Sequence, residues 1–319
     1  APTCTAGLLE QLAPWLGPEG EASGRERCLR EVLRRLLPLT LPPEALLPPA
    51  GDGRRGVWDF YCKGRCLGAG SFGVVRQAWD RYVGCEVAVK KIQLKEGVDV
   101  SREDVMREFG LLRDLSHPNL LRVLDIFACG KKLYLVTECA AAGDLTRHIA
   151  SAGKIEERWI AAVTRQVLAA CRFLHARRIV HHDIKPANVL VTAQHLPPPE
   201  ASVPCVLVAD FGLAQVERFV DHEAREQAGA GNGTNYYMAP ESAKGLSGPK
   251  TDVYAIGLML FELLSGGDGP EPISEEGEVS EVDWSMLAHC SKEAVTTTGL
   301  LIAPDVGERL SCKAALELG

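Results

Sequence analysis

Two short polar motifs, joined by a pair of apolar runs, constrain this chain more than any other feature of its sequence. Residues 181–188 read His-His-Asp-Ile-Lys-Pro-Ala-Asn, and residues 210–212 read Asp-Phe-Gly. The apolar runs 189–191 and 206–208 predict two short strands that bracket a Pro-rich insert. Each polar motif therefore lies at the end of a predicted strand.

The side chains of these motifs suit one kind of chemistry. Asp183 can accept a proton from an attacking hydroxyl group, and Lys185 can hold a phosphate. Asn188 and Asp210 offer oxygen ligands, which are the ligands that magnesium prefers. Together these residues indicate the transfer of a phosphoryl group.

A glycine-rich stretch earlier in the chain is a second candidate for phosphate binding. Residues 68–75 have the pattern Gly-x-Gly-x-x-Gly-x-Val, and glycine lets the backbone approach a phosphate closely. The pattern alone is a weak signal, because it also marks dinucleotide folds and plain turns. A dinucleotide fingerprint opens a helix, whereas residues 74–78 continue as a strand.

A lysine on the next predicted strand adds a positive charge. Residues 87–90 read Val-Ala-Val-Lys, so Lys90 ends a β-type run. The helix predicted at residues 102–115 carries two carboxylates, Glu103 and Glu108. Glu103 lies at the helix start and suits the helix dipole there, so Glu108 is the better candidate to pair with a cation.

Composition limits the class of protein. The 319 residues are enough for a domain of about 260 residues plus an extension. The apolar fraction of 46% and the charged fraction of 24% fit a soluble globular protein. A net charge of −7 argues against nucleic-acid binding, and no apolar run reaches the ~20 residues of a transmembrane segment. Eleven cysteines without a CxxC pair or a secretory leader predict reduced thiols and a cytoplasmic or nuclear location.

In their order and spacing, the motifs resemble those of eukaryotic-type Ser/Thr protein kinases. The Lys-Pro-Ala-Asn form of the first motif and residues 233–241, Gly-Thr-Asn-Tyr-Tyr-Met-Ala-Pro-Glu, carry the likeness to the Ser/Thr class. Residues 114–119 and 133–136 are similar to calmodulin- and calcium-dependent kinases. The resemblance covers residues 58 to 318.

This resemblance implies an α+β, two-lobed protein-kinase fold. The small N-lobe would hold an antiparallel sheet and one main helix, and the larger C-lobe would be mainly helical. Residues 1–56 would form an N-terminal extension with short helices and a Pro-rich linker. The kinase domain would span residues 57–319, with the N-lobe at 57–138, the hinge at 138–142 and the C-lobe at 143–319.

Apolar periodicity predicts elements that agree with this fold. Strands are expected at residues 61–67, 74–79, 86–92, 122–128 and 132–138, and helices at 102–115, 145–151, 156–176 and 251–264.

The resemblance also implies a role for each candidate catalytic residue. Lys90 would contact the α- and β-phosphates of ATP, with Glu108 as its partner. Asp183 would orient the substrate hydroxyl and accept its proton, while Lys185 would neutralise the moving phosphate. Thr234 would bond Asp183 and Lys185 in the manner of the Ser/Thr class.

ATP and Mg²⁺ are the cofactors that the resemblance implies. Asn188 and Asp210 would bind the metal. The adenine pocket would be lined by apolar side chains and the hinge backbone, with Thr137 as a small gatekeeper. The nucleotide-binding residues expected in this way are Gly68, Gly70, Gly73, Val75, Ala88, Lys90, Thr137, Glu138, Ala140, Asp144 and Leu190.

Structural roles are expected for some residues of the family's motifs, and for Asp144 such a role is the alternative to nucleotide binding. Asp144 would contact the ribose or a substrate arginine, or would instead cap the helix at 145–151. Glu241 and Arg309 are expected to form a buried ion pair. Asp252 matches the aspartate that braces the backbone of the catalytic loop in this family.

Two departures from the family pattern concern regulation. His182 stands where the family has an arginine that pairs with a phosphate on the activation segment. Histidine lacks the guanidinium fork that binds phosphate through two hydrogen bonds. Residues 213–233 contain no Ser, Thr or Tyr. We therefore expect activity that does not depend on activation-segment phosphorylation; the alternative is that His182 is neutral drift and control is exerted elsewhere.

The expected function is transfer of the ATP γ-phosphoryl group to hydroxyl groups of proteins. A pseudokinase scaffold that binds nucleotide or a partner is the alternative. The acidic segment 271–283 is a solvated loop or a docking site for basic substrates. Residues 1–56 pack on the domain or link it to another, or their basic helix at 25–37 docks a partner or a membrane surface.

Overall fold

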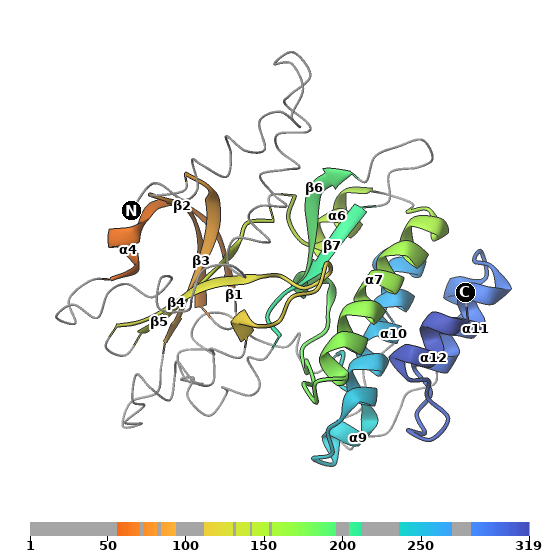
Figure 1. The fold of residues 1–319 in the computed structure, drawn as a ribbon. Coiled ribbons are helices and arrows are strands. Elements are labelled where there is room, and N and C mark those ends of the chain that lie inside the picture. Colours follow the sequence, from red (N-terminus) through yellow and green to blue (C-terminus); the bar gives the residue numbers. More distant parts are fainter. Residues whose placement is uncertain are drawn as a thin grey trace, which may run out of the picture. The chain divides into compact units, whose positions relative to one another are not determined.

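The structure of the chain is a computed structural model, drawn as a ribbon in Figure 1. It describes residues 56–70, 73–81, 84–93, 112–129, 132–140, 142–152, 155–195, 204–211, 236–269 and 282–318. All of these belong to one compact unit, Gly56–Gly319. The predictions for residues 1–55, for most of helix 102–115 and for segments 213–233 and 271–281 fall outside the described residues. The same holds for Glu103, Glu108 and Thr234.

A five-stranded antiparallel sheet forms the first half of the unit, after a short helix, α4 (Val57–Phe60). Its strands are β1 (Tyr61–Gly70), β2 (Gly73–Asp80), β3 (Glu86–Gln93), β4 (Val123–Cys129) and β5 (Lys132–Glu138), and they pair in the order β1-β2-β3-β5-β4. Each predicted strand is present: β5 has the predicted bounds, and the other strands differ from theirs by one to three residues at one end or both. The antiparallel sheet of the predicted fold is therefore confirmed.

Alternation along the strands explains why the sheet has two buried faces. In β5, Leu133 and Leu135 belong to the large core shared with the helices, while Val136 packs in a smaller cluster on the other face. In β3, Val87 and Val89 join that smaller cluster. Successive side chains of a strand point to opposite faces, so one strand supplies both cores.

The glycine turn between β1 and β2 differs from the prediction. The sequence pattern ends the first strand at residue 67, but the structure continues pairing to the turn, with Gly70 opposite Gly73. Gly73 has a φ of 131°, and a Cβ there would lie 1.8 Å from the Lys91 carbonyl oxygen. Only glycine fits so close to a neighbouring backbone, so the approach of β2 to β3 requires a glycine at position 73.

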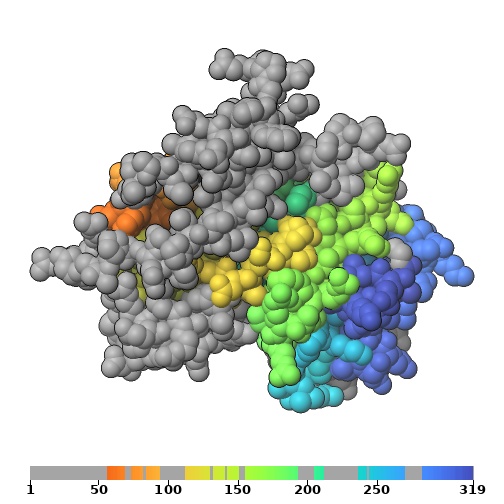
Figure 2. All heavy atoms as spheres, in the orientation of Figure 1, coloured from red at the N-terminus to blue at the C-terminus, as the bar shows by residue number. Residues whose placement is uncertain are grey.

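The second half of the unit is mainly helical, and it contains every helix and strand that the sequence predicts there. Its elements are α6 (Leu145–Ala152), α7 (Glu157–His175), η2 (Pro186–Asn188), β6 (Val189–His195), β7 (Pro204–Val208), α9 (Pro240–Ala243), α10 (Pro249–Ser265), η4 (Trp284–Leu287), α11 (Lys292–Leu301) and α12 (Cys312–Glu317). The helices α7, α10 and α12 lie side by side, and the C-terminal elements gather in one region of the space-filling view (Figure 2). Among the described residues, no helix is long and apolar enough to cross a membrane.

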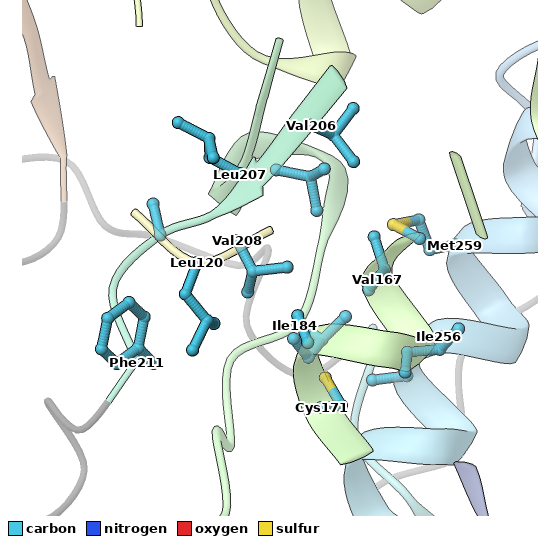
Figure 3. Packing of buried hydrophobic residues seen from close by; sticks show 14 of the residues in the cluster. Leu120, Val167, Cys171, Ile184, Val206, Leu207, Val208, Phe211, Ile256 and Met259 are labelled. Atoms are coloured by element: carbon cyan, nitrogen blue, oxygen red, sulfur yellow. The ribbon is translucent and has the colours of Figure 1, made fainter. Parts of the chain in front are cut away.

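A continuous apolar core joins the helices to the β6–β7 hairpin. Val206 and Val208 of β7 face Val167 and Cys171 of α7, and Ile256 of α10 packs behind them (Figure 3). Almost every side chain of α10 is buried, as expected for a helix that is apolar on all sides. The hairpin pairs Val189 with Val208, which brings the residues that precede β6 beside those that follow β7.

The predicted ion pair between Glu241 and Arg309 is confirmed. Arg309 is 1% exposed, and its Nη1 and Nη2 atoms lie 2.5 and 2.9 Å from the two Glu241 carboxylate oxygens. Its Nε donates to the Ala303 carbonyl at 2.8 Å. The bidentate pair fastens the short helix α9 to the loop before α12.

The close approach of α10 and α11 leads to a prediction about two glycines. A Cβ at Gly257 would lie 2.5 Å from Ile302 Cγ2 and 2.8 Å from Leu301 Cβ, whereas a Cβ at Gly299 would meet only Trp284 at 3.5 Å. Gly257→Ala should lower the free energy of unfolding by about 1–3 kcal/mol through overpacking. Gly299→Ala should raise it by about 0.5–1 kcal/mol, because alanine favours the helix. Urea unfolding of both variants measures this, and a shift of the same sign in both would contradict the packing.

Candidate functional site

Asp183, Lys185 and Asn188 meet in the loop between α7 and β6. Lys185 Nζ lies 2.8 Å from Asp183 Oδ1, and Asn188 Nδ2 donates to Asp183 Oδ2 at 2.8 Å. Asn188 Nδ2 also donates to the backbone carbonyl of Asp183 at 2.7 Å. Pro186 begins the 3₁₀ turn η2, which turns the chain so that these side chains converge. The Asp183 carboxylate is thus held through both of its oxygens and is still partly accessible.

Lys90 of β3 reaches Asp210 at the far end of β7. Its Nζ lies 2.6 Å from Asp210 Oδ2. The sequence predicts a pair with Glu108, which lies outside the described residues, and it does not predict the contact with Asp210. Because the two residues are 120 positions apart, no local sequence pattern indicates that they form an ion pair. The Ala209 amide donates to the Asn188 carbonyl at 2.8 Å, so Asp210 lies beside the catalytic-loop residues.

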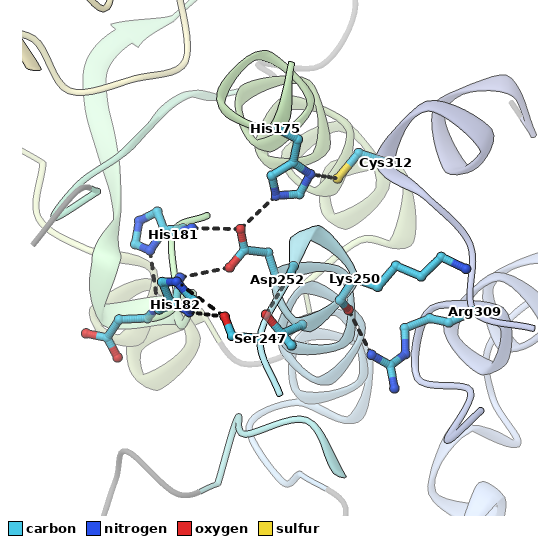
Figure 4. Close-up of polar contacts among 11 residues, drawn as sticks. His175, His181, His182, Ser247, Lys250, Asp252, Arg309 and Cys312 are labelled. Atoms are coloured by element: carbon cyan, nitrogen blue, oxygen red, sulfur yellow. Dashed lines mark hydrogen bonds and ion pairs between the residues drawn. The ribbon is translucent and has the colours of Figure 1, made fainter. Parts of the chain in front are cut away.

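Asp252, at the start of α10, braces this loop as predicted. Its Oδ2 accepts the His181 amide and its Oδ1 accepts the His182 amide, both at 2.8 Å (Figure 4). His182 has a φ of 67°, a left-handed conformation that the paired hydrogen bonds hold in place. Burial would raise the pKa of Asp252, but hydrogen bonds from His175 and from the His181 backbone hold that pKa below its ordinary value.

Two histidine rings complete the support of the loop. His181 Nε2 donates to the Ala209 carbonyl at 2.8 Å, while its Nδ1 accepts the Asp183 amide at 3.2 Å. His175, at the end of α7, places Nε2 at 2.7 Å from Asp252 Oδ2. Sequence reasoning missed His175, because a histidine in the last turn of a helix is expected to complement the helix dipole.

The sheet register brings the predicted nucleotide-binding residues together. Val75 of β2 pairs with Lys90 of β3, and Ala88 pairs with Thr137 of β5. Gly68 and Gly70 lie in the β1 end of the glycine turn, opposite Gly73 and its neighbours on β2. The half-buried Val75 and Ala88 can therefore line an apolar pocket beside the lysine.

Two backbone groups of the predicted hinge have partners within the fold. The Glu138 amide donates to the Arg122 carbonyl at 3.1 Å, and the Glu138 carbonyl accepts the Thr137 hydroxyl at 3.1 Å. The Glu138 N–H is therefore committed to the fold. That the hinge backbone binds adenine stays a prediction. Burial, with a contact to the Glu86 carboxylate, raises the pKa of the adjacent Cys139 thiol to about 12.

Asp144 caps the N-terminus of α6, which is one of the two roles predicted for it. Its Oδ1 accepts the Arg147 amide at 3.0 Å in the first turn of α6. Its backbone forms a bridge with Leu190 of β6, so these two predicted nucleotide-binding residues are neighbours. The structure does not bring Asp144 to a charged partner, and its role toward a ribose stays a prediction.

The donor set at Asn188 and Asp210 fits magnesium. Both protons of the Asn188 amide nitrogen are directed at Asp183, which leaves the amide oxygen as its ligand atom. Asp210 supplies carboxylate oxygens. Within the described ranges no three His, Cys, Asp or Glu side chains form a metal cage. Mg²⁺ is commonly bound by one or two protein oxygen groups that substrate phosphates and waters complete, so this sparse set suits it.

A cavity of about 570 Å³ lies away from this site. It is lined by residues from the start of α7 and the end of α10, such as Ile160 and Leu264, and by His289 before α11. It contains none of the predicted site residues.

Comparisons with known proteins agree with this geometry. The protein kinase domain family model matches residues 61–318. CBL-interacting protein kinase 11 of Oryza sativa subsp. japonica is 34% identical over 269 residues, which cover 82% of this chain and 51% of that protein. Calcium/calmodulin-dependent protein kinase cmkA of Emericella nidulans is 38% identical over 209 residues, which cover 65% of this chain and 47% of that protein. The chain thus spans about half the length of these curated relatives.

A solved structure has the same fold. The crystal structure of Rad53 1–466 in complex with AMP-PNP superposes with a TM-score of 0.66 at 25% identity, covering 82% of this chain and 66% of that one. The two-lobed α+β architecture predicted from the motifs is therefore confirmed.

The buried carboxylate of Asp252 generates a prediction. Asp252→Asn keeps the shape but turns an amide N–H₂ toward groups that are themselves donors. The free energy of unfolding should fall by about 1–3 kcal/mol, and the amide protons of His181 and His182 should exchange faster. Asp305→Asn is the matched control, since Asp305 is exposed and its carboxylate accepts the nearby Gly307 amide at 2.6 Å. Equal stability losses in both variants would contradict the bracing role.

Proposed function

Because this chain belongs to the protein kinase domain family, we propose that it transfers the γ-phosphoryl group of ATP to Ser or Thr hydroxyl groups of proteins. One observation carries the proposal: the network of Asp183, Lys185 and Asn188 lies beside the ion pair of Lys90 and Asp210. Phosphoryl transfer depends on positioning and on charge neutralisation, and this network supplies both.

Each polar side chain has a distinct task in this mechanism. Asp183 orients the substrate hydroxyl and accepts its proton, and its two hydrogen bonds fix the direction of the carboxylate. Lys185, at hydrogen-bond distance from Asp183, neutralises charge on the transferred group. Lys90 holds the α- and β-phosphates. Asn188 and Asp210 would hold Mg²⁺, which neutralises phosphate charge when it is bound.

Several features support the substrates and cofactors proposed. AMP-PNP is bound in the similar Rad53 structure, which favours ATP as the nucleotide here. A protein substrate follows from the family, and the acidic segment 271–283 favours basic sequences around the acceptor. We propose domain limits at 1–56 and 57–319, with a partner for residues 1–56. No disulfide links the cysteines of the described residues, which favours a cytoplasmic or nuclear location.

The proposed chemistry predicts the effect of two substitutions. Lys90→Met and Asp183→Asn should each lower kcat/KM by on the order of 10²-fold or more, because each removes charge from the reacting groups. Lys91→Met is the matched control, since Lys91 neighbours Lys90 on β3 but is exposed. Transfer of radiolabelled phosphate from ATP to a generic basic protein measures the rates. Full activity in either variant would contradict the role proposed for that residue in phosphoryl transfer.

The same assay separates the alternative function. A pseudokinase scaffold would bind ATP without turnover, so the wild-type protein would label no substrate and Asp183→Asn would change nothing. A nucleotide-binding measurement on the wild-type chain completes the comparison.

We further propose activity without phosphorylation of the activation segment. The His182 ring lies against Ser247, with Nδ1 at 3.2 Å from the Ser247 hydroxyl oxygen, and its backbone is held by Asp252. It offers one exposed imidazole where the family uses a guanidinium group. The lack of hydroxyl groups in residues 213–233 supports the same proposal.

This proposal makes a prediction about phosphate. Phosphatase treatment of the enzyme made in bacteria should leave its rate nearly unchanged, because residues 213–233 have no acceptor. His182→Arg should bring no gain, since it restores a receptor without a ligand, and an unpaired cation beside Asp183 would tend to lower activity. A tenfold fall after phosphatase, mapped to a site between Asp210 and Glu241, would refute the proposal.

A further inference from the structure

A chain of hydrogen bonds runs from the last helix to the catalytic loop. Cys312 Sγ, at the start of α12, lies 3.7 Å from His175 Nδ1 at the end of α7. His175 Nε2 lies 2.7 Å from Asp252 Oδ2 on α10, and Asp252 accepts the amides of His181 and His182 (Figure 4). Three helices thus contribute one side chain each to a continuous buried path.

The charge of Asp252 fixes the direction of the hydrogen bond to His175. Asp252 is 1% exposed and its pKa is held low against the effect of burial, so its carboxylate can only accept. His175 must therefore carry a proton on Nε2. Burial, aided by the negative charge of Asp252, raises the pKa of the Cys312 thiol to about 12. The thiol stays protonated, and its S–H can donate to the lone pair on Nδ1.

The surroundings of Cys312 hold its sulfur in place. Ser311 caps α12 by accepting the Ala314 amide at 3.2 Å, so Cys312 is the first residue of a defined helix. Arg309 is anchored to Glu241 just before it. The thiol is 2% exposed, so it does not exchange its hydrogen bond with bulk water.

We propose that Cys312 is a positioning residue that fixes His175 as the neutral Nε2–H tautomer and, through Asp252, holds the catalytic loop in register. Without the S–H donor, Nδ1 loses its protein partner at a site where the His175 side chain is only 11% exposed. An unpaired acceptor that is mostly shielded from water is costly, so the ring would exchange tautomers or rotate, and either change weakens its bond to Asp252. The effect on catalysis rests on the proposed kinase function; the tautomer of His175 does not.

The tautomer can be observed directly in the full-length chain. ¹⁵N NMR of histidine-labelled protein, with the His175 signals assigned through His175→Gln, should show one neutral Nε2–H form in the wild type. Cys312→Ser keeps a donor and should keep this form, whereas Cys312→Ala should give a mixture. Cys171→Ala is the matched control, because Cys171 is a buried thiol of the same core. An Nδ1–H form or an imidazolium in the wild type, or an unchanged spectrum in Cys312→Ala, would overturn the proposal.

Rates provide the second readout. Cys312→Ala should lower kcat by on the order of five-fold with the KM for ATP unchanged, while Cys312→Ser and Cys171→Ala stay within about two-fold of the wild type. Equal losses in both alanine variants would overturn the proposal, because they would show a general loss of packing. If Cys312→Ala does not fold, the wild-type tautomer and the serine variant still decide the matter. A wild-type protein without activity would refute the kinase function and leave the NMR test of the relay intact.

Discussion

The buried carboxylate of Asp252 is the interaction on which the rest of the site depends. Its two oxygens accept two successive backbone amides and the His175 ring, so one charge on α10 sets the path of the loop that carries Asp183. A buried charge is costly unless it is fully paired, and here three donors pair it. The left-handed backbone of His182 is held by the same contacts.

Around this anchor, separate elements each place one component of the site. The 3₁₀ turn η2 places the Asn188 amide against the Asp183 carboxylate. The β6–β7 hairpin places Asp210 close to Asn188, and β3 places the Lys90 amine against the Asp210 carboxylate. The ion pair of Glu241 and Arg309 secures the helices behind the loop. The site is thus assembled from strands and helices that are themselves packed in one core.

Short motifs that resemble those of a known family were sufficient to predict the fold and the structural roles of Asp252 and Arg309, because each belongs to a motif with a fixed order of residues. They could not predict contacts between groups far apart in sequence. The pair of Lys90 and Asp210, the histidine behind Asp252 and the capture of the Glu138 amide by Arg122 all depend on tertiary packing. The pairing of Gly68 and Gly70 with β2 was missed because glycine has a low strand propensity.

The contact between Lys90 and Asp210 also has a consequence for how the protein acquires its site. The two residues are 120 positions apart in sequence, and contacts of such separation form only after a large loop has closed. During synthesis the sheet that carries Lys90 is made first, and it cannot hold the complete set of charges until Asp210 has been added. A nascent chain could therefore have ordered strands before the site is complete.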